Sequence, residues 1–329
     1  MKRLWKLWVG ASLLAMASVT TTPVLAKDLV LSEIQPPGHI LIKSEELFAS
    51  RLAELTRGEL NVQIKHSAQL GNEDWSWKNV RTGAVDIARV NFAALINDVP
   101  VVKIVSLPYL FRSREHMWRV LNSDFGERVK FDIEQTGAVV LGYYDSGSRS
   151  FYTTRKPIRF RSDFEGQRIR VQNSPVMKDL ITLLGGTPVV IGYEKVVDAF
   201  KEGTIDGAEN NLPSYVATEH YKYARYLSMD EHSSVPEVLL MSKKAWDSLT
   251  PEQQKAVKTA ATESSESMKR MWAESEAAAL AKAKKEGVTV LEKHQLGMNG
   301  IETFAVKLYS KYVTDPKDLD TVLNILRSD

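Results

Sequence analysis

The sequence reads GAVDIARVN at residues 83–91 and GTIDGAENN at residues 203–211. Both stretches fit the frame G-x-[VI]-D-x-A-x-x-N, and the second begins 120 positions after the first. In each copy the glycine ends a helical pattern, and the residues that follow read as a short buried strand. The repeat therefore predicts two lobes built from the same structural unit.

The chain around both copies alternates strand patterns with amphipathic helix patterns, which is typical of an α/β protein. Turn residues separate these segments, and several helices have a cap residue at their start or a glycine at their end. The expected strands are residues 29–34, 60–64, 84–90, 168–172 and 205–208, and the expected helices are residues 40–57, 73–82, 175–184 and 193–202.

A long helical pattern begins near residue 250. Thr250 is placed to cap it, Pro251 stands at the first helical position, and Gln253 completes a capping box. The pattern continues to Gly287, about 50 Å if unbroken at 1.5 Å per residue. Such a helix is longer than one small lobe and would brace both; the alternative is two helices that meet near residues 264–267.

Polar residues follow the strand in each copy of the repeat. Arg89 and Asn91 end the first copy, and Asn210 and Asn211 end the second. Open α/β sheets bind their ligands at the carboxyl ends of the strands. Two lobes that face each other would place these four residues around one cleft.

Arg170 lies inside a strand pattern, between Ile169 and Val171. An arginine at such a position is costly unless it meets an anion. Its planar guanidinium can hold a carboxylate with two parallel hydrogen bonds. The alternative is a surface arginine paired with an Asp or Glu of the protein itself.

The first 26 residues have the pattern of a cleaved signal peptide. Lys2, Arg3 and Lys6 precede an uncharged apolar run, and Val24-Leu25-Ala26 supplies a cleavage site. A membrane anchor is the alternative, but polar residues interrupt the run before it reaches spanning length. Cleavage leaves 303 of the 329 residues, with 40 of the 43 basic residues against 41 acidic ones. This near-neutral balance argues against a nucleic-acid partner.

The sequence lacks the usual signatures of catalysis and metal binding. It has no cysteine, no H-E-x-x-H, no G-x-S-x-G and no Gly-rich phosphate loop, and its six histidines show no metal-ligand spacing. Glu73 and Glu237 remain open as a pair of carboxylates that converge in space. We therefore expect a binding protein, not an enzyme, with no cofactor and no metal.

Several motifs in order along the chain resemble the solute-binding subunit of TRAP (tripartite ATP-independent periplasmic) transporters. They are Gln69-Leu70-Gly71-Asn72-Glu73, Leu107-Pro108-Tyr109-Leu110-Phe111, Arg149 followed by Arg155-Lys156-Pro157-Ile158, Asp163 to Val171, Ile205 to Asn210, and His232 to Leu240. The resemblance implies a periplasmic-binding-protein-like α/β fold: two lobes with mixed sheets, a cleft between them and a long helix bracing both. It also implies a periplasmic monomer that closes around an organic acid and delivers it to small and large integral-membrane subunits. We expect residues 27–146 and 236–275 to form lobe I and residues 147–235 and 276–329 to form lobe II.

The resemblance also assigns roles to individual residues. Arg170 matches the arginine that forms a salt bridge with the ligand carboxylate, and Arg149 matches a second cleft arginine. Asn210 matches a cleft asparagine, Tyr193 an aromatic residue against the ligand, and Glu73 a polar cleft residue. The chain departs from the family at Lys195-Val196-Val197, where the family commonly has E-V-Y.

The segment from Asp206 to Tyr215 resembles the branch that binds hexuronates such as D-glucuronate or D-galacturonate, as do Arg89-Val90-Asn91 and His232 to Val238. A uronate has one carboxylate and several hydroxyls that both donate and accept hydrogen bonds. The expected polar contacts, besides Arg170, Arg149 and Tyr193, are His39, Lys43, Glu73, Arg89, Asn91, Gln172, Asn173, Asn210, Asn211 and Glu237. A C4-dicarboxylate is the runner-up ligand, since Arg149 could hold a second carboxylate. Two less favoured functions are an exported uronate-processing enzyme and a ligand-sensing module for a receptor.

Overall fold

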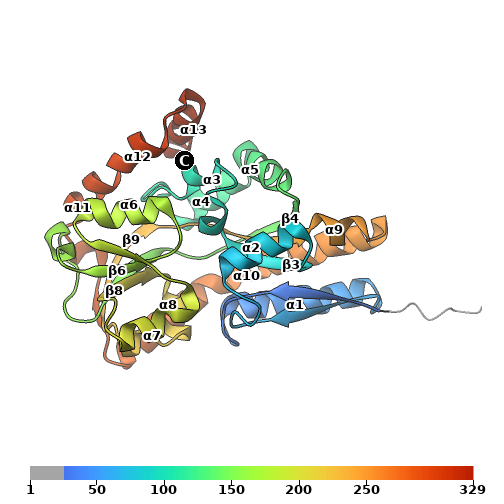
Figure 1. Ribbon diagram of the computed structural model, residues 1–329, viewed down its shortest axis with the longest axis horizontal. Helices are drawn as coiled ribbons and strands as arrows, with labels where there is room; N and C mark the ends of the chain where they lie inside the picture. Colours follow the sequence, from blue (N-terminus) through green and yellow to red (C-terminus); the bar gives the residue numbers. More distant parts are fainter. Residues whose placement is uncertain (1–25, 329) are drawn as a thin grey trace, which may run out of the picture.

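The computed structural model describes residues 26–328 and contains two β-sheets surrounded by helices (Figure 1). The predicted signal peptide lies outside the described residues, apart from Ala26. Among the described residues, no helix is long and apolar enough to cross a membrane.

The first sheet is mixed, with strand order β2-β1-β3-β10-β4. Strands β1, β2 and β3 run parallel, and β10 lies antiparallel between β3 and β4. Its strands are β1 (Lys27–Ser32), β2 (Leu60–Lys65), β3 (Ile87–Asn91), β4 (Ala138–Tyr144) and β10 (Glu237–Ser242). The surrounding helices are α1 (Ile40–Leu55), α2 (Glu73–Thr82), α3 (Val102–Val105), α4 (Arg114–Leu121), α5 (Asp124–Glu134) and α9 (Lys243–Asp247). Apolar side chains form a buried core on each face of this sheet.

The second sheet is also mixed, with strand order β11-β9-β5-β8-β6-β7. Its strands are β5 (Arg149–Thr153), β6 (Arg168–Val171), β7 (Thr187–Val190), β8 (Gly207–Asn210), β9 (Tyr226–Ser233) and β11 (Thr289–Leu291). The helices near it are α6 (Pro175–Leu184), α7 (Val196–Lys201), α8 (Leu212–Ala217), α11 (Met298–Ala305) and α12 (Lys307–Tyr312). Two further cores cover its faces.

The sequence repeat is a repeat of structure. Gly83 and Gly203 both have positive φ angles, 73° and 65°, where a helix ends. The two aspartates of the frame accept backbone N–H bonds from the neighbouring strand: Asp86 from Val30 at 2.9 Å and Asp206 from Arg168 at 3.0 Å. The frame therefore encodes the same helix-to-strand junction in both sheets.

The last asparagine of each copy is a cap. Asn91 accepts from the backbone N–H of Ala93 and starts a 3-10 turn, Phe92–Leu95. Asn211 accepts from Ser214 and starts α8. Both strands thus end in a capped helical turn, which brings polar residues to the edge where the sheets face each other.

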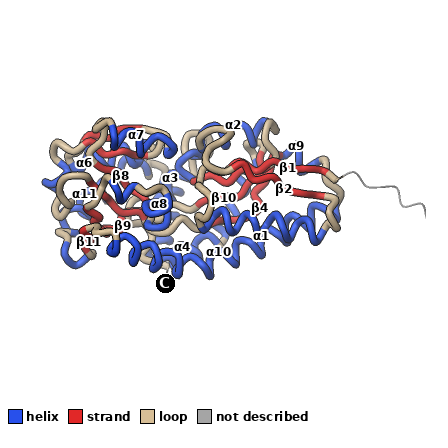
Figure 2. The backbone as a smooth tube through the Cα atoms, turned by 90° about the horizontal axis from the view of Figure 1, so that it is seen from below, coloured by secondary structure: helices blue, strands red, loops and turns tan. Residues whose placement is uncertain are grey.

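Within residues 26–328, three segments lead from a strand of one sheet to a strand of the other: residues 145–148, residues 234–236 and the segment that contains the helix α10 (Pro251–Lys285). The predicted long helix is confirmed as one continuous element with the Thr250–Gln253 capping box, and the alternative of two helices is wrong. Its first part, up to Trp272, packs in the core of the first sheet, and Ala279 and Ala283 pack in a core of the second. Figure 2 shows α10 running along the molecule beneath both sets of strands.

The end of the chain departs from the expected arrangement. Three helices follow β11, and the last, α13 (Pro316–Arg327), returns to the first sheet (Figure 1), although the predicted division places residues 276–329 in lobe II. Val322 and Ile325 of α13 are buried in the core there, because α13 is amphipathic and lies over the helices of that sheet. We propose the two-lobe division as predicted, except that α13 belongs with lobe I.

Candidate functional site

A cavity of about 310 Å³ lies between the two sheets, within the range of small-molecule sites. A recess of about 20 Å³ continues from it and shares five lining residues. The first sheet and its helices contribute Ile34, Gln35, Asn72, Glu73, Asp74, Ala93, Ala94 and Glu237 to the two spaces, and the second contributes Arg149, Arg170, Gln172, Asn173, Val190, Ile191, Gly192, Tyr193, Asn210, Asn211 and Ser214.

Arg170 is the cation of this cavity. It sits on β6 with 3% of its surface exposed, and its Nε donates to the backbone oxygen of Ile191 at 2.9 Å. No carboxylate among the described residues lies within ion-pair distance of it. Burial lowers the pKa of Arg170, although Glu209 opposes this effect from farther away. The guanidinium therefore lines the cavity as a buried charge without a counter-ion, which is the arrangement that an anionic ligand would complete.

Arg149 is the opposite case, because the protein already neutralises it. On β5 it forms an ion pair with Glu209, and its Nη1 donates to Oδ1 of Asn210 at 2.7 Å. Burial disfavours its charge, but Glu209 outweighs burial and raises the pKa of Arg149. Arg149 orients Asn210 in the recess and has no free charge for a second ligand carboxylate.

His232 continues the network behind Arg149. Its Nδ1 lies 3.0 Å from Asp230, its Nε2 lies 3.5 Å from Glu209, and its ring stacks on Phe151. Burial alone would lower the pKa of His232, but Asp230 and Glu209 raise it to about 9. A protonated His232 thus helps to hold Glu209 in place for Arg149.

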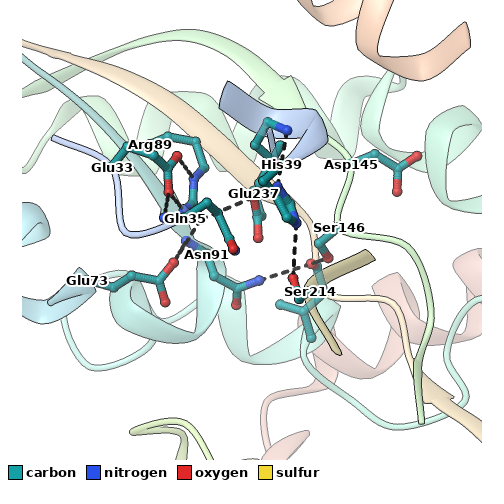
Figure 3. Close-up of polar contacts among 12 residues, drawn as sticks. Glu33, Gln35, His39, Glu73, Arg89, Asn91, Asp145, Ser146, Ser214 and Glu237 are labelled. Atoms are coloured by element: carbon teal, nitrogen blue, oxygen red, sulfur yellow. Dashed lines mark hydrogen bonds and ion pairs between the residues drawn. The ribbon is translucent and has the colours of Figure 1, made fainter. Parts of the chain in front are cut away.

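The opposite wall is acidic. Figure 3 shows Arg89 of β3 surrounded by Glu33, Glu73 and Glu237. Glu33 takes the Nε and Nη2 edge of the guanidinium, Glu73 accepts from Nη1 at 2.9 Å, and Glu237 lies 3.2 Å from the same nitrogen. Arg89 is fully buried, so it binds the protein's own carboxylates and not a ligand.

Hydrogen bonds across the cavity hold the two walls together. Tyr193 donates to Oε1 of Gln35 at 3.0 Å, and Nε2 of His39 lies 3.2 Å from Oγ of Ser214. Burial lowers the pKa of His39 to about 3, so its ring is neutral at physiological pH. Further along, Asn173 donates to Asp74 at 3.3 Å. The lobes of this structure are therefore in contact around the site.

Nine of the thirteen predicted site residues line the cavity or its recess, namely Arg170, Arg149, Asn210, Glu73, Tyr193, Gln172, Asn173, Asn211 and Glu237. The other four do not. Arg89 is enclosed by carboxylates, and Asn91 caps a turn. His39 forms a hydrogen bond with Ser214 of the other lobe, and Lys43 is exposed on α1. These four were expected as ligand contacts because a uronate needs a ring of polar side chains, and the sequence shows polar residues but not their partners within the protein.

The sequence reasoning missed four polar residues of the lining: Gln35, Asn72, Asp74 and Ser214. Asn72 caps the start of α2, and the sequence shows it only as part of a turn and of a family motif. Gln35 follows β1 at its carboxyl end, so the same strand-end rule that selected Asn91 would have selected it. Ser214 lies in the Pro213-Ser214-Tyr215 segment, where the family resemblance alone pointed to the site. Asp74 sits in the first turn of α2 and carries no distinguishing pattern.

The arrangement suits recognition more than reaction. One unpaired guanidinium faces a wall of carboxylates and amides, so the cavity can accept an anion at one end and hydroxyl groups at the other. Among the described residues, no group of three or more His, Cys, Asp or Glu is placed to hold a metal ion.

Comparison with known proteins gives consistent matches over most of the chain. The family model described as "Bacterial extracellular solute-binding protein, family 7" matches residues 31–313. A curated solute-binding protein from Chromohalobacter salexigens is 32% identical over 293 residues, which cover 88% of this chain and 86% of the relative.

Two solved structures show the same fold with sugar acids bound. A TRAP periplasmic solute-binding protein from Xanthobacter autotrophicus, with bound β-D-galacturonate, has a TM-score of 0.87 and 36% identity, and the match covers 92% of this chain and all of that one. One from Roseobacter denitrificans, with bound β-D-glucuronate, has a TM-score of 0.87 and 32% identity over the same shares.

Proposed function

The chain belongs to family 7 of the bacterial extracellular solute-binding proteins, and we propose that it captures a hexuronate of the D-galacturonate or D-glucuronate type. It is a periplasmic TRAP solute-binding protein that delivers the sugar acid to the transporter in the inner membrane. There we expect a small and a large integral-membrane subunit to receive it.

The observation that carries this proposal is the unpaired guanidinium of Arg170 in the cavity wall. A carboxylate placed against its two Nη atoms would form the charge-assisted bidentate pair that the protein does not supply. The sugar ring would then extend towards Gln172 and Asn210 on one wall and Glu73 on the other. These side chains match the donors and acceptors of ring hydroxyls.

The charges of the site favour one carboxylate and not two. Arg149, the only other arginine among the residues that line the two described spaces, is neutralised by Glu209. A second carboxylate in the recess would approach Glu73, and like charges at short range repel. The C4-dicarboxylate alternative therefore fits less well than a monocarboxylate with hydroxyl groups.

Thermal unfolding with a ligand panel tests this proposal. The panel contains D-galacturonate, D-glucuronate, the matching neutral hexoses and C4-dicarboxylates. At 100 times its dissociation constant a specific ligand should stabilise the protein by about 2.7 kcal/mol. Stabilisation by a neutral hexose or a dicarboxylate, without any effect of the hexuronates, would refute the proposal.

We further propose that the protein binds the sugar acid without changing it. Family membership supports solute binding. Chromatography of D-galacturonate and D-glucuronate after incubation with the protein should return each compound unaltered, and appearance of a product would overturn this part of the proposal.

A further inference from the structure

The acidic wall holds more carboxylates than its single arginine can neutralise. Glu33, Glu73 and Glu237 all lie within ion-pair distance of Arg89. Glu45 of α1 is fully buried beside Glu33. Four carboxyl groups around one guanidinium cannot all be ionised in a region closed to water, because like charges at short range raise the cost of ionisation.

The geometry of Arg89 shows which carboxyls keep their charge. Glu33 receives two of its N–H bonds and a backbone bond from Gln35. Burial raises the pKa of Glu33, but Arg89 outweighs burial and lowers it to about 2. Glu73 receives the N–H of Nη1 and the backbone N–H of Asn91. Glu33 and Glu73 thus take three of the five N–H groups of Arg89, and Oε2 of Glu237 receives a hydrogen bond from none of the others.

Glu237 has an oxygen without a hydrogen-bond partner. Only 4% of the residue is exposed, and its Oε2 finds no hydrogen bond among the described residues although it lies 3.2 Å from Nη1 of Arg89. The side chain lines the recess next to the ligand cavity. With about 20 Å³, the recess admits one water or one hydroxyl group and no larger polar group.

From this geometry we propose that Glu237 is a specificity-determining residue that binds the ligand as a neutral carboxylic acid, donating a hydrogen bond from its carboxyl O–H to one ring hydroxyl. Binding is then linked to a proton: the ligand requires Glu237 protonated and does not tolerate the carboxylate. This inference rests on the proposed capture of a hexuronate and names the group that recognises its hydroxyl end.

The charged groups that face Glu237 support the neutral form. Burial raises its pKa to about 8; Arg89 lowers it, while Glu73 and Glu33 add to the rise and a contact with Asn91 opposes it. Tyr144, its neighbour on β4, has a raised pKa, and His39 is neutral. Tyr193, Arg149 and Arg170 line the other side of the recess. Arg149 forms an ion pair with Glu209, and Arg170 would form one with the ligand carboxylate.

The experiment is calorimetric titration of the protein with whichever of D-galacturonate and D-glucuronate binds more tightly near neutral pH. One pH unit above the pKa of about 8, only about a tenth of the protein has Glu237 protonated, so the affinity should fall about tenfold. Titrations in two buffers of different ionisation enthalpy should show uptake of close to one proton per ligand at that pH, and much less near neutral pH. The ligand carboxyl stays ionised throughout this range and adds nothing.

Glu237→Gln separates the neutral acid from the carboxylate, because an amide donates a hydrogen bond but does not ionise. We expect this variant to bind near neutral pH within a few-fold of the unmodified protein and to lose both the alkaline fall and the proton uptake. Glu73→Gln should move the fall to lower pH, because it removes a like charge that raises the pKa of Glu237. Glu263→Gln is the control: it removes a solvent-exposed carboxyl of α10 that lies outside the cluster and outside the lining residues, and it should leave the pH profile unchanged.

Three results would overturn the inference: an affinity that does not change over this pH range, an unchanged alkaline fall in Glu237→Gln, or a loss of more than tenfold by that variant near neutral pH. None of these outcomes affects the proposed function, which fails instead if neither hexuronate binds the unmodified protein near neutral pH.

Discussion

Replacing Arg170 and Arg149 by methionine should give opposite results, although both are buried arginines with 3% exposed surface. Methionine keeps much of the side-chain volume and removes the charge. Residues 26–328 offer Arg170 one backbone hydrogen bond, to Ile191, and no counter-ion. We therefore expect the free energy of unfolding of ligand-free Arg170→Met to stay within about 1 kcal/mol of the unmodified protein.

The same change should abolish most of the binding. A carboxylate that loses two charge-assisted hydrogen bonds, each worth about 1.5–3 kcal/mol, loses at least about 3 kcal/mol. Since 1.4 kcal/mol corresponds to a factor of ten, the affinity for the hexuronate should fall more than about 100-fold.

Arg149→Met should instead unfold more easily. It leaves Glu209, which is fully buried, without its main cation. Breaking a buried pair in this way costs about 3–5 kcal/mol, and the low end applies because His232 remains 3.5 Å from Glu209.

Urea denaturation and calorimetric titration of the two variants, side by side, measure both quantities. If Arg170→Met were destabilised as much as Arg149→Met, Arg170 would have an unrecognised partner in the protein and the assignment of its role would fail. Binding by Arg170→Met within tenfold of normal would refute the carboxylate contact directly.

Three further predictions concern stability. The pKa of His232 is about 9 in the folded protein and 6.5 ordinarily, so protonated His232 stabilises the fold fully below about pH 6.5, and this stabilisation is lost as pH rises through about 9. His232→Gln should therefore lower the free energy of unfolding by about 2–3 kcal/mol near pH 6 and by less near pH 10. An equal decrease at both pH values would contradict this. Trp272→Ala removes a fully buried ring from α10 and should cost about 3–5 kcal/mol in urea denaturation, where a cost under 1 kcal/mol would mean that the helix packs otherwise. Thr250→Ala removes the cap of the same helix and should cost about 1 kcal/mol, with the exposed Thr262→Ala of α10 as the control.

The elements of the fold were predictable where local chemistry decides them. Helix α2 begins and ends at the expected residues, because Asn72 caps its start and Gly83 adopts the left-handed conformation after its end. The second repeat strand was placed two residues early. Its bounds depend on pairing with β5 and β6, and a Cβ at Gly207 would lie 2.8 Å from the backbone oxygen of Tyr152. Such pairing is not visible in a single segment of sequence.

The site shows the same limit more sharply. Arg170 and Arg89 both lie in short strands and both were expected to meet a ligand. Only coordinates show that Arg89 is enclosed by Glu33, Glu73 and Glu237, residues up to 204 positions apart in the chain. Whether a buried charge is free or already neutralised depends on such distant partners. The family resemblance assigned Arg170 to the ligand carboxylate, which the sequence pattern alone could not do. It assigned no individual role to Arg89, so the ion pairs of Arg89 were not foreseen.

The two walls of the cavity belong to different sheets and differ in charge, with Arg170 on one and Glu73 on the other. A compound that carries only an acid group, or only a ring of hydroxyls, engages one wall and leaves the other in contact with water. Such a compound can occupy the protein without drawing the lobes together. Membrane subunits that dock on the closed shape alone would then reject it without ever touching the bound molecule.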